Sequence, residues 1–139
     1  MDSMIAVRGM MISKAEVERT KNEIPKGLGI HMNIEEVSQE GGFIQISFTY
    51  VADYAEDVAR LTIKGVMTVE EEKKVRDKVM KVWKEKKRLE DEFAEEVLNH
   101  INFACGAHGT LIARVVNLQP PMMPPRIRLD KEGTGASAA

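Results

Sequence analysis

The sequence predicts an α+β domain, a four-stranded antiparallel sheet covered by long C-terminal helices. Three observations support this class. Apolar and polar residues alternate along most of the first seventy residues, which is the pattern of half-buried strands. No glycine or proline then interrupts Val69 to Cys105, which indicates helix. Four of the five prolines fall between Pro120 and Pro125, where a fixed φ and missing N–H donors favour an extended path.

The first expected strand runs from Met4 to Val17, and its apolar phase changes part of the way along. Apolar residues occupy odd positions before Gly9 and even positions after it. A β-bulge near Gly9 would reset the register in this way. The stretch from Lys21 to Gly29 contains Pro25 and two glycines and is expected to be a loop.

Three more strands follow, centred on Ile30–Ile34, Ile44–Tyr50 and Leu61–Met67, each with apolar residues at every second position. Short polar turns at residues 39–42 and 53–57 separate them. Such short connections predict an antiparallel meander with one apolar and one polar face.

The helical half is expected to begin at Thr68, which with Glu71 forms a capping box. A narrow apolar stripe that includes Trp83 then continues through many charged residues. One long helix, or two with a break near Lys86 and Lys87, both fit this pattern. A helix that overhangs a small sheet favours packing against a second subunit, so we expect a homo-oligomer, a dimer or tetramer.

From Leu98 the helix becomes apolar on more than one side, because Phe103, Ala107 and Leu111 widen the stripe formed by Ile101 and Cys105. We therefore expect it to be buried. The proline segment that follows carries Met122 and Met123, which either lie on an apolar surface or remain open to a partner.

Composition sets limits on function. The 139 residues suffice for one domain, assigned to residues 1–131, with a small polar flexible tail at 132–139. A net charge of −2 disfavours nucleic acid as a partner. A single cysteine and an N-terminus without a secretory signal favour a cytoplasmic location. No apolar run approaches bilayer-spanning length, so membrane insertion is not expected.

Evidence for catalysis is weak. His100, Cys105 and His108 are the best metal candidates, but His100 lies off the face that the other two share, and no fourth ligand is near. Nothing in the sequence places a base beside Cys105. We therefore expect no enzyme, no catalytic residue, no metal and no cofactor. Trp83 fits a core or interface anchor better than a residue that caps a ligand site.

The proline segment admits three interpretations. It is a strap over the core, a ligand for an aromatic groove on another protein, or one wall of a groove that receives extended peptides. The nine methionines of the chain are typical of adaptable apolar surfaces, although they equally suit an irregular core.

Two segments resemble the SecB family of protein-export chaperones. Leu111–Ile127, LIARVVNLQPPMMPPRI, is similar to the family's helix followed by two prolines, an apolar pair and another proline. Val58–Glu70, VARLTIKGVMTVE, is similar to the last strand of that fold and its entry into the first helix. The motifs cover only part of the chain, and the order of elements resembles the family over most of it.

The resemblance implies ATP-independent binding of unfolded or extended apolar polypeptide segments, a chaperone or holdase function connected with protein export. Its clients would be unfolded polypeptides, held in a groove between the sheet and the loop after the helix. The substrate-binding residues that the resemblance implies are Phe48, Tyr50, Leu118, Met122, Met123 and Ile127.

This chain also departs from the family. Arg60 and Lys64 lie on the polar sheet face, which in the family is acidic and docks a motor ATPase. The charged helix Glu70–Glu96 replaces a much shorter element. Two alternatives remain, a small-molecule-binding protein or enzyme with a pocket near Trp83, Cys105 and His108, and a structural subunit of a larger assembly.

Overall fold

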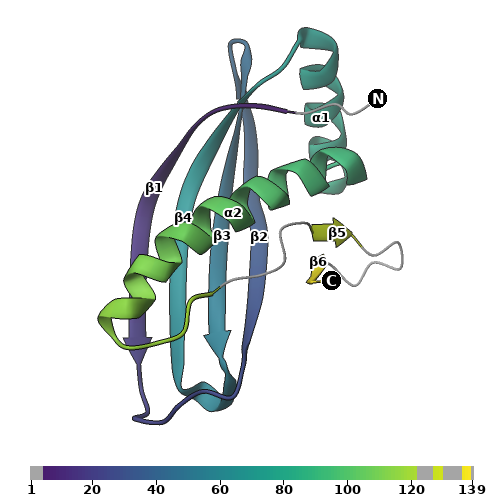
Figure 1. The fold of residues 1–139 in the computed structure, drawn as a ribbon. Coiled ribbons are helices and arrows are strands. Elements are labelled where there is room, and N and C mark those ends of the chain that lie inside the picture. Colours follow the sequence, from purple (N-terminus) through teal and green to yellow (C-terminus); the bar gives the residue numbers. More distant parts are fainter. Residues whose placement is uncertain (1–4, 122–126, 130–135, 139) are drawn as a thin grey trace.

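Four antiparallel strands form one sheet in the computed structural model, which describes residues 5–121, 127–129 and 136–138. The strand order is β1-β4-β3-β2, and the strands that are neighbours in the chain from β2 to β4 pair as hairpins. Their bounds are β1 (Ala6–Arg19), β2 (Leu28–Glu40), β3 (Phe43–Tyr54) and β4 (Ala59–Glu70). The predicted α+β class with a four-stranded antiparallel sheet is confirmed (Figure 1).

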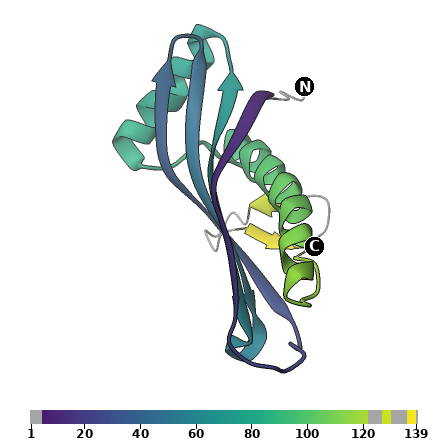
Figure 2. The same ribbon diagram turned by 90° about the vertical axis from the view of Figure 1, so that its left-hand side faces the viewer.

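Two helices follow the sheet, and α2 lies across one of its faces (Figures 1 and 2). Neither is long and apolar enough to cross a bilayer, in the described part of the chain. A short antiparallel pair, β5 and β6, is formed near the C-terminus. The bounds are η1 (Ala55–Asp57), α1 (Lys73–Lys86), α2 (Asp91–Val115), β5 (Ile127–Leu129) and β6 (Ala136–Ala138).

The core lies between the sheet and α2. On β3 and β4 every second residue is apolar, and because successive side chains alternate between faces, all of these residues reach the face beneath α2. The largest fully buried side chains from these two strands are Tyr50, Tyr54, Phe48, Ile44, Ile46, Leu61, Ile63, Met67 and Val69. From α2 the buried residues Val97, Ile101 and Cys105 complete the layer.

Strand β1 contains two irregularities. Its pairing with β4 shifts between Val7 and Gly9 and again between Ile12 and Lys14. The bulge that the sequence predicts near Gly9 is confirmed, and the second, at Ser13, is an addition. Each extra residue restores the apolar side chains of the edge strand to the core side.

Gly65 allows β1 to approach β4 closely. A Cβ atom at this position would lie 2.6 Å from the carbonyl oxygen of Met11 and 3.1 Å from Cζ of Phe48. Only a residue without a side chain fits between the neighbouring backbone and the aromatic ring.

The predicted helix start at Thr68 is wrong. Thr68 lies in β4 and pairs with Gly9 of β1 and Gln45 of β3, and the helix begins at Lys73 after the N-cap residue Glu72. Cross-strand pairing on both sides outweighs the local capping signal, because Met67 and Val69 continue the alternation into the core.

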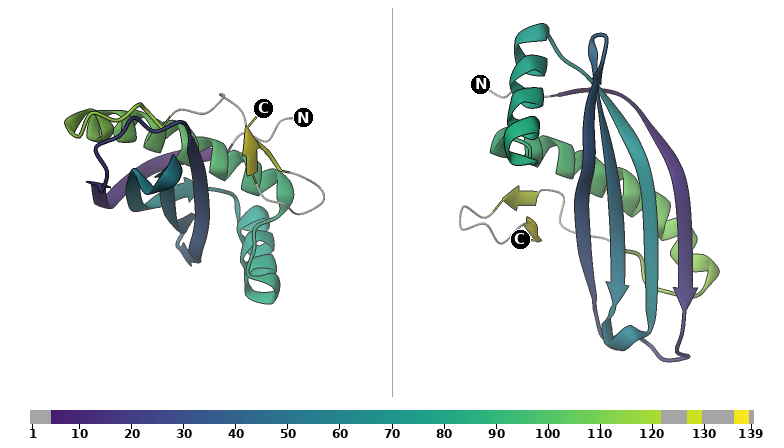
Figure 3. Two further views of the ribbon diagram at one scale, coloured as in Figure 1. Left: turned by 90° about the horizontal axis from the view of Figure 1, so that it is seen from below. Right: turned by 180° about the vertical axis from the view of Figure 1, so that it is seen from behind.

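Of the two helical arrangements that the sequence allows, the structure has the interrupted one. Lys87 adopts a left-handed conformation with φ of 54° and donates its backbone N–H to the carbonyl oxygen of Trp83. This left-handed residue ends α1, as expected for a C-terminal cap. A second helix, α2, then begins at Asp91 in a new direction (Figure 3).

The expected burial of the apolar helix is wrong on one side. Phe103, Leu111 and Val115 of α2 are 81%, 66% and 78% exposed. They follow one another at spacings of eight and four residues with the exposed Ala107 between them, so they share one face of the helix. One sheet cannot cover both sides of a helix, and this outer face of α2 has no partner among the described residues.

Candidate functional site

Three of the residues expected to bind substrate belong to the core. Phe48 and Leu118 are 2% and 5% exposed, and Tyr50 is fully buried. The sheet face that the predicted groove requires is therefore covered at these residues.

The chain after α2 turns back across the same sheet face (Figure 1). Two tyrosine hydroxyls of β3 hold it there. Tyr50 donates a hydrogen bond of 3.1 Å to the carbonyl oxygen of Pro121, and Tyr54 donates one of 2.5 Å to that of Gln119. Pro121 is buried against α2, where a Cβ on Gly109 would lie 2.8 Å from its Cγ. The first part of the proline segment is therefore a strap on the core.

The remaining substrate-binding predictions concern the rest of this segment. Met122 and Met123 lie outside the described residues. Ile127 is the first residue of β5, and its side chain lies outside the described part of the structure. Their proposed role stays a prediction.

The alternative site near Cys105 is not assembled by this fold. Cys105 is fully buried, and burial raises the pKa of its thiol to about 12, so that the nucleophilic thiolate is rare near neutral pH. His108 is exposed, whereas His100 is half-buried. The described residues contain no group of His, Cys, Asp or Glu side chains arranged to hold a metal ion.

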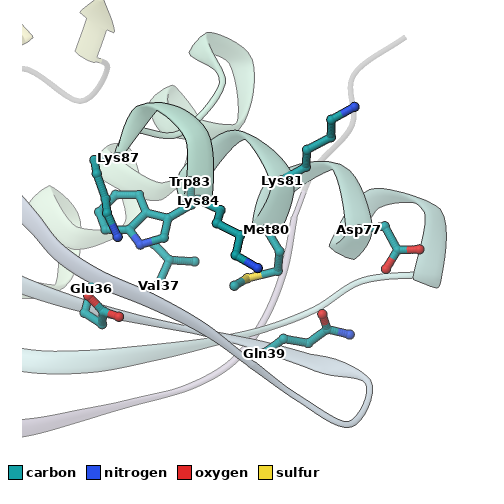
Figure 4. Close-up of a pocket in the computed structure, with 9 residues that line it drawn as sticks. All are labelled: Glu36, Val37, Gln39, Asp77, Met80, Lys81, Trp83, Lys84 and Lys87. Atoms are coloured by element: carbon teal, nitrogen blue, oxygen red, sulfur yellow. The ribbon is translucent and has the colours of Figure 1, made fainter.

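A groove of about 470 Å³ lies between α1 and β2. Its apolar part consists of Val37, Met80 and Trp83, and neither Cys105 nor His108 lines it. The volume is within the range of ligand sites in proteins, which is roughly 300–1,000 Å³. The polar residues around it are Glu36, Gln39, Asp77, Lys81, Lys84 and Lys87 (Figure 4).

A bulge in β2 builds the strand side of the groove. The pairing of β2 with β3 shifts between Ile34 and Glu36, so Glu35 is the extra residue. Apolar side chains occupy even positions before this bulge, whereas Val37 after it occupies an odd position and is only 2% exposed. The bulge thus directs Val37 toward the helix.

The backbone of β2 also faces the groove. In the sheet, β2 is an edge strand with β3 as its partner. The amide of Glu71 donates a hydrogen bond of 3.4 Å to the carbonyl oxygen of Gly42, so the backbone groups of Gly42 point toward β4. Because backbone groups alternate in direction along a strand, those of every second residue after Gly42 on β3 also point toward β4. Ile44 is one of these residues, so it forms no backbone hydrogen bonds with Gln39, its partner on β2. The N–H and C=O of Gln39 therefore point away from β3, and so do those of Val37 two residues earlier.

Lysine side chains border the helix side. Figure 4 shows Lys84 and Lys87 extending from the helix toward β2, whereas Lys81 extends away from the strand. The ammonium nitrogen of Lys87 lies 5.7 Å from the centre of the Trp83 ring, a cation–π distance. Asp77 is already paired with Lys73 at 2.8 Å.

Trp83 carries an unused hydrogen-bond donor into this space. The side chain is 5% exposed, and its indole Nε1 has no hydrogen-bond partner in the described structure. Figure 4 shows the nitrogen edge of the indole turned toward β2. A buried donor without a partner costs about 1–3 kcal/mol, which an acceptor entering the groove would offset.

Sequence reasoning considered Trp83 as a possible ligand residue but missed the rest of the groove. The spacing of Met80, Trp83 and Lys87 places them on one helix face, which is a readable signal. The phase change at Val37 is another. Nothing in the sequence shows that α1 lies beside β2, because this contact joins segments far apart in the chain.

Comparison with known proteins yields no relative: no family model, no curated protein and no solved structure matches this chain.

Proposed function

We propose that this protein binds extended apolar segments of polypeptides without using a nucleotide, and that it does so in the groove between α1 and β2. The observation that carries the proposal is the free edge of β2 beside an apolar groove. An extended chain can add to an open sheet edge through its backbone, while its alternate side chains enter a neighbouring pocket.

Both requirements of strand addition are present at the same place. The outward backbone groups of Val37 and Gln39 supply donors and acceptors that are indifferent to client sequence. Val37, Met80 and Trp83 supply the apolar contact. Burial of client surface there provides about 25 cal/mol per Å², and methionine adapts to side chains of different shape.

The resemblance to the SecB chaperones supports the same class of function, with the site moved from the strap to the α1/β2 groove. Phe48, Tyr50 and Leu118 then act as the buried support of the sheet. Unfolded polypeptides are the proposed partners, and the reaction involves no covalent step.

Trp83 allows a direct test, because it is the chain's single tryptophan. Titration with an extended apolar peptide should change the tryptophan fluorescence saturably, and the protein should suppress aggregation of an unrelated unfolded protein without ATP. Saturable binding with an unchanged Trp83 signal would place the client elsewhere, and absence of both effects would reject the function.

Strand addition itself is tested at Gln39. A Gln39→Pro change removes an outward N–H that β3 does not use, so the fold should remain while peptide binding weakens, because proline is tolerated at sheet edges. The matched control, Gln39→Ala, removes the side chain and keeps the N–H, and should bind as the unmodified protein does. Equal binding by both variants would contradict strand addition.

A further inference from the structure

Within the proposed function, on which this inference rests, the α1/β2 groove has a charge preference. We infer that it selects extended segments in which an acidic side chain stands beside an apolar one. The relevant juxtaposition is Lys84, Lys87 and the indole Nε1 of Trp83 on one wall, next to the apolar surface of Met80 and Val37.

Positive charge on the helix wall is not neutralised. No ion pair within 4 Å joins Lys84 or Lys87 to any carboxylate among the described residues, whereas Lys73 and Lys78 of the same helix pair with Asp77 and Glu90. Both unpaired lysines point toward the strand (Figure 4).

The Trp83 donor is a second, independent indication. Its Nε1 faces the space between helix and strand, is buried, and lacks a partner. A carboxylate oxygen would accept a hydrogen bond from this N–H while its charge lies near the two ammonium groups. The exposed side chain of Lys87 covers the ring and must turn aside, which a flexible lysine does readily.

Glu36 opposes the same ligand from the strand wall. It is exposed and contributes the unpaired carboxylate of the groove lining, since Asp77 is held by Lys73. A client carboxylate is therefore expected on the helix side of the groove, next to Lys84, and not on the strand side.

The test uses four peptides of equal length and apolar content, with acetylated N-termini. Three have amidated C-termini and differ only in carrying glutamate, glutamine or lysine between the apolar residues. The fourth carries glutamine and a free C-terminal carboxylate. The glutamate peptide should bind about tenfold more tightly than the glutamine peptide at low salt, as expected for charge-assisted contacts, and the lysine peptide more weakly still. The difference should shrink toward equality near 1 M salt, where the Debye length is about 3 Å.

Variants locate the effect. Lys84→Gln with Lys87→Gln should reduce the preference for the glutamate peptide over the glutamine peptide to within about twofold. The matched control, Lys74→Gln with Lys86→Gln, removes two exposed lysines of α1 outside the groove and should retain the preference. Glu36→Gln should tighten binding of the glutamate peptide relative to the glutamine peptide and weaken that of the lysine peptide.

The outcomes separate this inference from the proposed function. Equal binding of the glutamate, glutamine and lysine peptides would overturn the charge preference and leave strand addition intact. A free C-terminal carboxylate that binds as tightly as the internal glutamate would overturn the assignment to a side chain. Absence of binding by all four peptides would reject both.

Discussion

The hydroxyl of Tyr50 donates a hydrogen bond of 3.1 Å to the backbone carbonyl oxygen of Pro121, across 71 positions in the chain. Together with the bond from Tyr54 to Gln119, it fixes the chain after α2 to the sheet. Tyr50→Phe should lower the free energy of unfolding by about 1–3 kcal/mol, because it leaves a buried carbonyl without a partner. Urea unfolding measures the change.

Tyr54→Phe is the companion variant. Both bonds hold the same short segment, so their effects should be coupled and the double variant should differ from the sum by more than about 0.5 kcal/mol. A strictly additive double variant would mean that the two tyrosines do not act on a common strap.

Replacement by alanine should have opposite effects on stability at Gly109 and at Gly106. A Cβ on Gly109 would lie 2.8 Å from Cγ of Pro121, and a proline ring cannot move aside, so Gly109→Ala should destabilise the protein by about 1–3 kcal/mol. A Cβ on Gly106 would meet the carbonyl oxygen of Pro121 at an ordinary 3.5 Å. Gly106→Ala should therefore stabilise it, by up to about 1 kcal/mol of helix propensity.

Thermal unfolding of the two glycine variants provides the comparison. If both substitutions shift the melting temperature in the same direction, the close packing of Pro121 on α2 is not the cause.

Alkaline pH should destabilise the fold. Burial raises the pKa of Cys105 from 9.0 to about 12, and burial also raises the pKa of Tyr50. The unfolded chain releases these protons at lower pH than the folded chain does. The stability contribution of Cys105 is therefore complete below about pH 9 and is lost as pH rises toward 12. The urea concentration at which half of the protein is unfolded, measured between pH 7 and 10.5, should fall from about pH 9 upward.

The same burial protects the thiol of Cys105. A thiol-specific reagent at pH 8 should modify the folded protein at the rate of its opening and the urea-unfolded chain at the rate of a free thiol. Comparable rates in the two states would show that Cys105 is accessible.

The outer face of α2 should mediate self-association. Phe103, Leu111 and Val115 are exposed together on one side of the helix, and solvent-facing apolar surface of this kind marks protein interfaces. We expect a dimer or larger species in sedimentation at micromolar concentration, and monomers for Phe103→Asp with Leu111→Asp. Circular dichroism confirms that the variant is folded.

A matched control for self-association is available elsewhere on the surface. Met11 and Ile24 are 75% and 88% exposed and lie outside α2. Met11→Asp with Ile24→Asp adds the same two charges at apolar positions and should leave the oligomer unchanged. Dissociation by this control would attribute the effect to net charge, and a monomeric unmodified protein would show the prediction to be wrong.

The sheet could be predicted from the sequence because its signal is local and repeated. Ile44 to Tyr50 alternates without a fault, and strands with one buried face require that alternation. The sequence allows either one helix or two with a break near Lys87. It does not decide between them, because a lysine that adopts the left-handed conformation cannot be told from the other lysines around it. The capping box at Thr68 wrongly predicts a helix start, because the pairing of Thr68 with two neighbouring strands is a long-range property that local sequence does not show.

The site was harder to predict, for the same reason. The sequence places Phe48 and Tyr50 on the apolar face of the sheet. Only the position of α2 decides whether these two residues line a groove or fill a core. The α1/β2 groove depends on where one helix lies beside a sheet edge. That placement is a contact between segments far apart in the chain, and no local sequence pattern specifies it.

Gly65 has a consequence for how this domain tolerates variation. At other positions on the interior side of β4, valine or isoleucine is the residue best suited to a strand. At residue 65 the space is occupied by the Met11 carbonyl and the Phe48 ring, so even alanine forces two strands apart. In a complete set of single-residue replacements, this site should tolerate none of the nineteen alternatives, because the packing of two strands and one ring excludes any side chain.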